Sequence, residues 1–252
     1  MLDTSLGLLA HTAAGTALPP LALVAAQLAS SGLEVAARVV SSVVALIMCI
    51  TVHEFGHAWV ADRLGDPLPR RQGRVTLNPL AHIDPLGTVI FPALMALGTP
   101  IPLAWGKPVE WTGHPAYLTR RFSMRTIRFF VSVAGPAMNL LLALAISLLF
   151  LLFAKLGRTD AMIMCMRLIA MNFGLMFFNL LPIPPLDGRV FLEYLPNSLA
   201  IVRDTLTRYG SFIFLALILL GGLGGASPLS YIMRPFHELT TLYLTALHSL
   251  VR

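Results

Sequence analysis

The sequence predicts an all-α polytopic membrane protein, and three observations support that fold class. Of its 252 residues, 56% are hydrophobic and only 12% are charged, a balance far from that of soluble domains. Several apolar stretches are long enough to cross a bilayer as helices. Nine of the eighteen Lys and Arg residues lie between Asp62 and Arg128, in loops beside apolar segments. This distribution is typical of a cytoplasmic face, and it explains the net charge of +6 without a nucleic-acid partner.

We expect about five to six transmembrane helices, a re-entrant element and short β-strands on the cytoplasmic side. Residues 5–29 could form a first, interrupted span, and residues 35–61 form the second. Residues 87–104 are apolar but broken by Pro and Gly, and basic loops lie on both sides of them. A re-entrant element therefore suits this stretch better than a full crossing. The short strands are predicted at Arg74–Leu77 and Pro108–Trp111.

The second half of the chain continues the helical pattern. Four segments follow the basic loops: residues 129–153, 162–181, 209–225 and 231–251. The last of them is amphipathic and could lie on the surface or cross weakly. We therefore expect one membrane-embedded domain over residues 1–252, with its core at about 35–190 and C-terminal helices at 191–252.

The second span carries the sequence His53-Glu54-Phe55-Gly56-His57. Histidines four residues apart on a helix present both rings on one face, so they can bind one metal ion. Glu54 could then take a proton from water at that metal. An unpaired Glu inside a span costs roughly 2.5–3.5 kcal/mol, and a bound zinc ion would supply the compensating charge. The alternative is a trio that bonds internally and only joins helices.

A third ligand candidate follows the span at residues 162–181. That span ends in Asn-Leu-Leu-Pro-Ile-Pro-Pro-Leu-Asp-Gly, residues 179–188, where three prolines within four residues end the helix. Irregular backbone at membrane depth is tolerated where it lines an enclosed or wet cavity. Asp187 emerges there on the same expected cytoplasmic side as His53 and His57, so the topology brings an oxygen ligand to the two imidazoles.

Three other residues have simpler interpretations. Cys49 and Cys165 both fall in apolar spans, and we expect buried thiols, not a disulfide or metal ligands. His82 lies in Thr-Leu-Asn-Pro-Leu-Ala-His-Ile-Asp-Pro-Leu-Gly-Thr, residues 76–88, which is rich in turn and cap formers. A cap or turn role is favoured for this histidine over chemistry.

Three motifs in order make the chain resemble the site-2 protease family of intramembrane zinc metalloproteases. They are HEFGH at residues 53–57, GPAMN at 135–139 and NLLPIPPLDG at 179–188. The segment around His82 resembles the compact prokaryotic branch without a PDZ domain. The resemblance covers about residues 43–189. Arg189 stands where the family often has a second glycine, which leaves the ligand assignment intact.

The resemblance implies one zinc ion per chain, held by His53, His57 and Asp187, with Glu54 as catalytic base. Asn179 matches a position that engages the substrate backbone. Asn139 belongs to a family motif and could bind substrate or be structural.

The expected function is hydrolysis of a peptide bond within the transmembrane segment of a membrane-protein substrate, releasing a membrane-tethered regulator. The expected partners are that substrate and the lipid bilayer, in a prokaryotic cell membrane with the active site towards the cytoplasm. The two predicted strands could align an unwound substrate by β-augmentation. One alternative is a catalytically inactive relative that binds membrane partners, and another is a zinc transporter with an intramembrane His/Asp site. Neither gives Glu54 a role.

Overall fold

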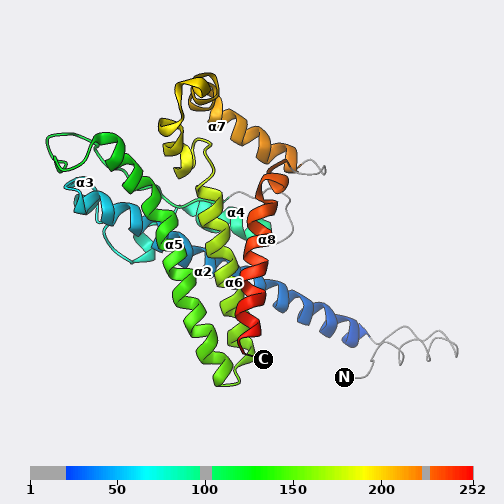
Figure 1. The fold of residues 1–252 in the computed structure, drawn as a ribbon. Coiled ribbons are helices and arrows are strands. Elements are labelled where there is room, and N and C mark those ends of the chain that lie inside the picture. The colour runs from blue at the N-terminus through cyan, green and yellow to red at the C-terminus, as the bar shows by residue number, and fades with distance from the viewer. Residues whose placement is uncertain (1–20, 97–103, 223–227, 252) are drawn as a thin grey trace. The chain divides into compact units, whose positions relative to one another are not determined.

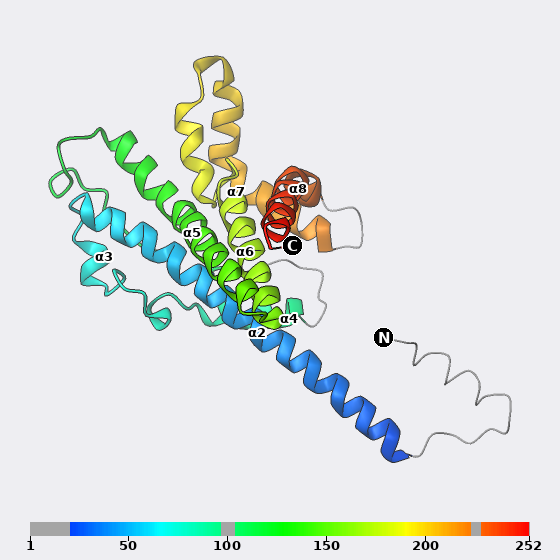
Figure 2. The same cartoon turned by 60° about the horizontal axis from the view of Figure 1, so that its bottom comes forward.

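The computed structural model describes residues 21–96, 104–222 and 228–251, and these residues form an all-helical protein (Figures 1 and 2). Contacts within the chain divide it into two units, Met1–Arg38 and Val39–Arg252. The described part of the first unit is the beginning of a long helix, α2. Every motif noted above lies in the second unit.

Five long helices and several short ones make up the described chain. The long helices are α2 (Leu21–Arg63), α5 (Met124–Lys155), α6 (Thr159–Asn179), α7 (Ala200–Gly222) and α8 (Pro228–Ser249). The short elements are α3 (Leu68–Arg71), η1 (Pro79–Ala81), the π-helix η2 (Pro85–Ile90), α4 (Phe91–Ala96), η3 (Asp187–Tyr194) and η4 (Asn197–Leu199).

Three of the described helices are long and apolar enough to cross a membrane: Gly32–Arg63 within α2, α5 and α6. The predicted number of five to six is therefore too high for the described residues. The predicted first span, residues 5–29, lies largely outside them. Helices α7 and α8 do form near their predicted positions, but charged residues interrupt both, for example Arg208 in α7 and Arg234 in α8.

Helices α5 and α6 form an antiparallel pair that α8 covers along one side (Figures 1 and 2). Gly157, at φ +65°, permits the tight turn between them. Buried apolar side chains fill the contact: Ala143, Ile146 and Phe150 of α5, Cys165, Ile169, Phe173 and Met176 of α6, and Leu247 of α8. The Tyr243 hydroxyl of α8 also bonds the Ser147 hydroxyl of α5 at 2.8 Å. This packing fixes the end of α6, and the loop after it, beside α5.

The predicted strands are absent from the described residues. Arg74–Leu77 and Pro108–Trp111 form irregular loops, because side chains take the backbone groups that a β-ladder would need. His82 Nε2–H donates to the Thr76 carbonyl at 2.8 Å. The Val109 N–H donates to Glu54 Oε2 at 3.0 Å. The two predicted strands are therefore wrong: in these segments, side chains bind the backbone groups and the chain forms loops.

The segment predicted to be re-entrant begins and ends at the same place. It leaves through η2 and α4 and returns, after residues outside the description, at Trp105. The Trp105 N–H donates to the Gly87 carbonyl at 3.1 Å, and the Thr88 hydroxyl donates to the Trp105 carbonyl at 2.8 Å. A Cβ on Gly87 would collide with the Trp105 ring. The two ends of this segment therefore lie together, and its re-entrant course in a membrane stays a prediction.

Candidate metal centre

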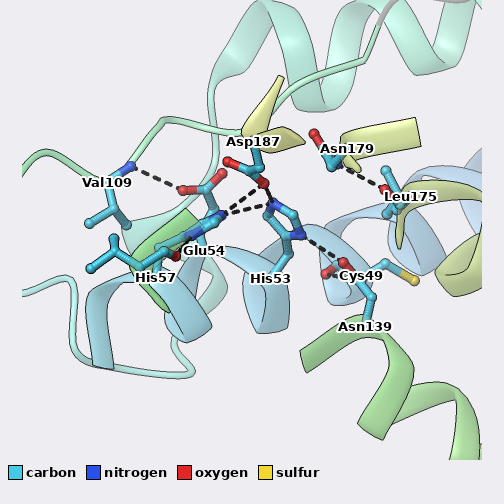
Figure 3. A network of polar contacts seen from close by, with 10 residues as sticks. Cys49, His53, Glu54, His57, Val109, Asn139, Leu175, Asn179 and Asp187 are labelled. Atoms are coloured by element: carbon cyan, nitrogen blue, oxygen red, sulfur yellow. Dashed lines mark hydrogen bonds and ion pairs between the residues drawn. The ribbon is translucent and has the colours of Figure 1, made fainter. Parts of the chain in front are cut away.

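Three potential ligand atoms meet where α2 approaches the loop after α6 (Figure 3). The Nε2 atoms of His53 and His57 lie 3.1 Å apart, and Asp187 Oδ2 lies 3.2 Å from each of them. Ligands of a tetrahedral zinc ion, with bonds of about 2.0–2.1 Å, lie about 3.3 Å from one another. The nearly equilateral triangle therefore has the dimensions of one face of a zinc tetrahedron.

Hydrogen bonds on the far side of each ring decide which imidazole nitrogen is free. His53 Nδ1 bonds Asn139 Oδ1 at 2.7 Å, and His57 Nδ1 donates to the Val131 carbonyl at 2.7 Å. In the neutral rings both Nε2 atoms therefore carry lone pairs that point at Asp187 Oδ2, a buried oxygen without a hydrogen-bond donor. Three acceptors facing one another repel, and a bound cation removes that repulsion. The donor set thus fits zinc.

Asn139 reaches His53 through a fully buried amide network. Its NH2 group donates to the Cys49 carbonyl at 3.2 Å and to Asn172 Oδ1 at 2.9 Å, which leaves its own oxygen to accept from His53. Asn172 in turn donates to Cys49 Sγ at 3.2 Å and to the Leu168 carbonyl at 2.8 Å. Every polar atom of Asn139 is bonded inside the protein. Its contacts thus favour orienting His53 and offer nothing to a substrate.

Glycine makes the close approach of α2 and α5 possible. A Cβ on Gly135 of α5 would lie 2.7 Å from the Cε1 atoms of both His53 and His57. A Cβ on Gly56 of α2 would lie 2.7 Å from the Ala134 carbonyl oxygen and from Met138 Cγ. Helix α5 therefore presents bare backbone to the imidazole rings, and this lets the edges of both rings approach it closely.

The third ligand comes from the turn that follows α6. The Pro184–Pro185 peptide bond is cis, and Leu186 is buried among apolar residues of α7 and α8. A Cβ on Gly188 would collide with the Leu180 and Leu181 carbonyls, so the chain folds tightly back on the end of α6. This turn places Asp187 over the two histidines.

Glu54 lies beside the metal centre on α2 (Figure 3) and is 9% exposed. Its Oε2 accepts the Val109 N–H at 3.0 Å, while Oε1 takes no hydrogen bond from the described residues. One carboxylate oxygen is thus fixed by the backbone and the other is available. A general base needs such a free oxygen.

The remaining sequence candidates lie close to the centre or behind it. Asn179, the last residue of α6, donates to the Leu175 carbonyl at 3.0 Å, and its side chain lies on the Asp187 side of the site (Figure 3). His82 is fully buried and ends η1 as its C-cap, the turn role that the sequence favours. Burial lowers the pKa of His82, so the ring is neutral. Cys49 and Cys165 are buried free thiols.

Sequence reasoning missed three contributors to the site. The Val131 carbonyl and the Val109 N–H are backbone groups, and no residue type marks them. Asn172 lies inside the apolar stretch at residues 162–181 and belongs to none of the three motifs. An asparagine in an apolar helix needs partners, which was the signal available.

Two histidines and a glutamate on one helix, with an aspartate closing the triangle, define the class of zinc metalloproteases. Comparison with known proteins identifies the family. The profile of Peptidase family M50 matches residues 41–167, and the chain belongs to this family, that of the site-2 proteases.

Two relatives illustrate the similarity. The chain is 35% identical over 185 residues to "Putative zinc metalloprotease YwhC" of Bacillus subtilis, covering 69% of this chain and 78% of that protein. It is 36% identical over 194 residues to "Putative zinc metalloprotease Rip2" of Mycobacterium tuberculosis, covering 75% of this chain and 68% of the relative. No solved structure matches significantly.

Proposed function

We propose that this metalloprotease hydrolyses a peptide bond within the transmembrane segment of a membrane-protein substrate. One observation carries the proposal: the metal centre is built by the three helices that can span a membrane. Helix α2 supplies His53 and His57, α5 supplies the backbone and Asn139 behind them, and α6 leads into Asp187. A site assembled from such helices suits a substrate that lies in the bilayer.

Different residues of the chain carry out metal binding, proton transfer and substrate binding. Zinc, held by His53, His57 and Asp187 as one ion per chain, would polarise the scissile carbonyl and acidify a water molecule. Glu54 Oε1 accepts the proton of the attacking water and returns it to the leaving amine. Asn179 holds the substrate backbone beside Asp187, with its free amide oxygen and second N–H as the contacts.

The substrate must unwind before it is cut, because a helix hides each carbonyl in a bond to the amide four residues on. The substrate class is therefore a membrane protein whose apolar segment unwinds easily, and its cleavage frees a membrane-tethered regulator. The basic loops between Asp62 and Arg128 favour a cell-membrane protein with its active site towards the cytoplasm.

The test uses the full chain in liposomes with a panel of tagged single-span proteins whose apolar segments differ in Gly and Asn content. We expect the wild type to cut at least one of them inside the apolar segment, as product masses would show. Glu54→Gln should abolish cleavage and keep one zinc per chain, whereas Asp187→Ala should lose the zinc. Cuts only outside the apolar segment would overturn the proposal. So would uptake of zinc into the liposomes by both the wild type and Glu54→Gln, which would indicate a transporter.

A further inference from the structure

Residues 104–114 form a loop without helix or strand that passes beside Glu54, and we call it the strap. The Val109 N–H, near its middle, donates to Glu54 Oε2 at 3.0 Å. This hydrogen bond is the strap's contact with the general base, so the position of the strap determines how the carboxylate is held.

Arg74 anchors the strap on one side of Val109. Its side chain is 3% exposed, and its guanidinium donates to the carbonyls of Ala81 and Lys107. Ala81 precedes the re-entrant segment and Lys107 follows it. The Lys107 N–H also donates to the His82 carbonyl at 2.9 Å. One buried side chain therefore closes both ends of that segment, two residues before the amide that contacts Glu54.

Asp66 anchors the strap on the other side. It is fully buried, and its Oδ2 accepts from the Thr112 N–H at 2.7 Å, the Thr112 hydroxyl at 2.7 Å and the Gly113 N–H at 3.1 Å. Its Oδ1 accepts from the Leu68 N–H at 3.0 Å. This carboxylate, three residues beyond Val109, uses both oxygens to hold the strap against the loop that follows α2.

Both anchors, Asp66 and Arg74, are buried charged side chains, whereas uncharged groups often suffice to hold a loop in place. Removing a charge from water costs several kcal/mol, and only well-placed hydrogen bonds offset that cost. Hydrogen bonds to a charged group are also stronger and shorter than neutral ones. A short chain pinned at Lys107 and at Thr112 leaves Val109 little freedom to move.

We propose that Asp66 and Arg74 are positioning residues for Glu54, acting through the Val109 N–H. The amide holds Oε2 and so points Oε1 at the water that is to be deprotonated. A carboxylate without this bond can rotate about its side-chain torsions and lose the geometry of proton transfer. The assignment of Glu54 as base rests on the proposed function, whereas the anchoring of the strap does not.

The test compares Asp66→Asn and Arg74→Lys with a matched pair, Asp62→Asn and Arg70→Lys. Arg70 donates to Asp62 through two hydrogen bonds, of 2.8 and 2.6 Å, and within the described structure neither side chain is seen to hydrogen-bond the strap. Asparagine offers one oxygen in place of two, and lysine offers one nitrogen in place of two. We expect hydrogen exchange in peptides covering residues 104–114 to speed up at least roughly tenfold in the first pair only. Both pairs should keep their zinc.

Activity on a cleaved substrate from the panel then tests the route to Glu54. We expect Asp66→Asn and Arg74→Lys to lower kcat roughly 10–100-fold with little change in KM. Val109→Pro removes the N–H itself and should lower kcat similarly, whereas Val109→Ala keeps the N–H and should not. In the Val109→Pro background, Arg74→Lys should cost nothing further, because both changes remove one interaction.

Three results would overturn the inference. Unchanged exchange in the strap would show that the anchors do not hold it, whether or not any substrate is cut. Full activity of Val109→Pro would exclude the amide as the link, even if the anchor variants failed to fold. If the losses of kcat caused by Val109→Pro and Arg74→Lys were additive in the double variant, Arg74 would have a merely structural role. Failure of the wild type to cut the panel would instead count against the proposed function.

Discussion

Gly135→Ala is expected to remove zinc from the protein although it should favour the helix. Replacing a helical glycine by alanine stabilises a helix by up to about 1 kcal/mol. At this position, however, the new Cβ would lie 2.7 Å from Cε1 of both His53 and His57. Carbon atoms in contact prefer about 3.5–4.0 Å, so each ring would have to retreat by about 1 Å.

Such a retreat far exceeds what a metal site tolerates. Ligand distances in metal centres hold to within about 0.2 Å, and even substitutions behind the ligands weaken metal binding about 10–100-fold. Because Gly135→Ala displaces two ligands at once, we expect zinc affinity to fall by at least roughly 100-fold. The protein purified in detergent should then contain far less than one zinc per chain.

The matched control is Gly174→Ala, since a Cβ at Gly174 of α6 would meet no atom within 4 Å. This variant should keep its zinc and unfold at the same or a slightly higher temperature. Metal analysis and thermal unfolding on the two variants provide the comparison. A Gly135→Ala protein that retains one zinc per chain would refute the reasoning, because the rings could then not lie against the α5 backbone.

The remaining predictions concern the residues around the centre and the core. Asn139→Ala should weaken zinc binding about 10–100-fold by freeing the His53 ring, and competition with a chelator of known affinity measures this; unchanged affinity would contradict the orienting role. Removing zinc with a chelator should lower the unfolding temperature of the wild type but not of Asp187→Ala, as expected for a ligand that binds only the folded state; equal shifts would argue against Asp187 as a ligand. Burial lowers the pKa of His82 below its ordinary 6.5, so stability is full above that pH and decreases as pH falls below it. The loss in unfolding temperature on acidification from about pH 7.5 to about pH 5.5 should therefore be smaller in His82→Gln than in the wild type, and equal losses would contradict this account. Phe150→Ala, in the fully buried core between α5 and α6, should cost about 3–5 kcal/mol, whereas Leu148→Ala, at a 70% exposed position, should cost less than about 1 kcal/mol; similar losses in denaturant unfolding would contradict this packing.

The sequence predicts the metal centre better than it predicts the surrounding loops. Spacing alone places His53 and His57 on one face of a helix, and the prolines before Asp187 mark the turn that carries it. These are local signals with a direct structural consequence. In the structure the three side chains come within 3.2 Å of one another.

The sequence did not predict the conformation of the loops between α2 and α5, because that conformation depends on partners far away in the chain. Arg74 is one of the charges that indicate a cytoplasmic face, yet it is buried and bonds two carbonyls. A short strand was predicted at Pro108–Trp111, but the Val109 N–H donates to Glu54, 55 residues earlier. Sequence patterns report which side chains are apolar. They do not report which backbone groups a buried charge will capture.

The polar groups around the site fix the orientation of its three potential ligands. Each histidine is fixed from behind, by Asn139 or by the Val131 carbonyl, so neither ring can turn its Nε2 away. Asp187 is fixed by a turn that packs on the end of α6. Partners outside the triangle thus hold His53 Nε2, His57 Nε2 and Asp187 Oδ2 within 3.2 Å of one another, a spacing that fits the ligands of one zinc ion. Such an arrangement makes zinc affinity depend on residues that never contact zinc, because any change that lets one ligand turn away breaks up the preformed triangle.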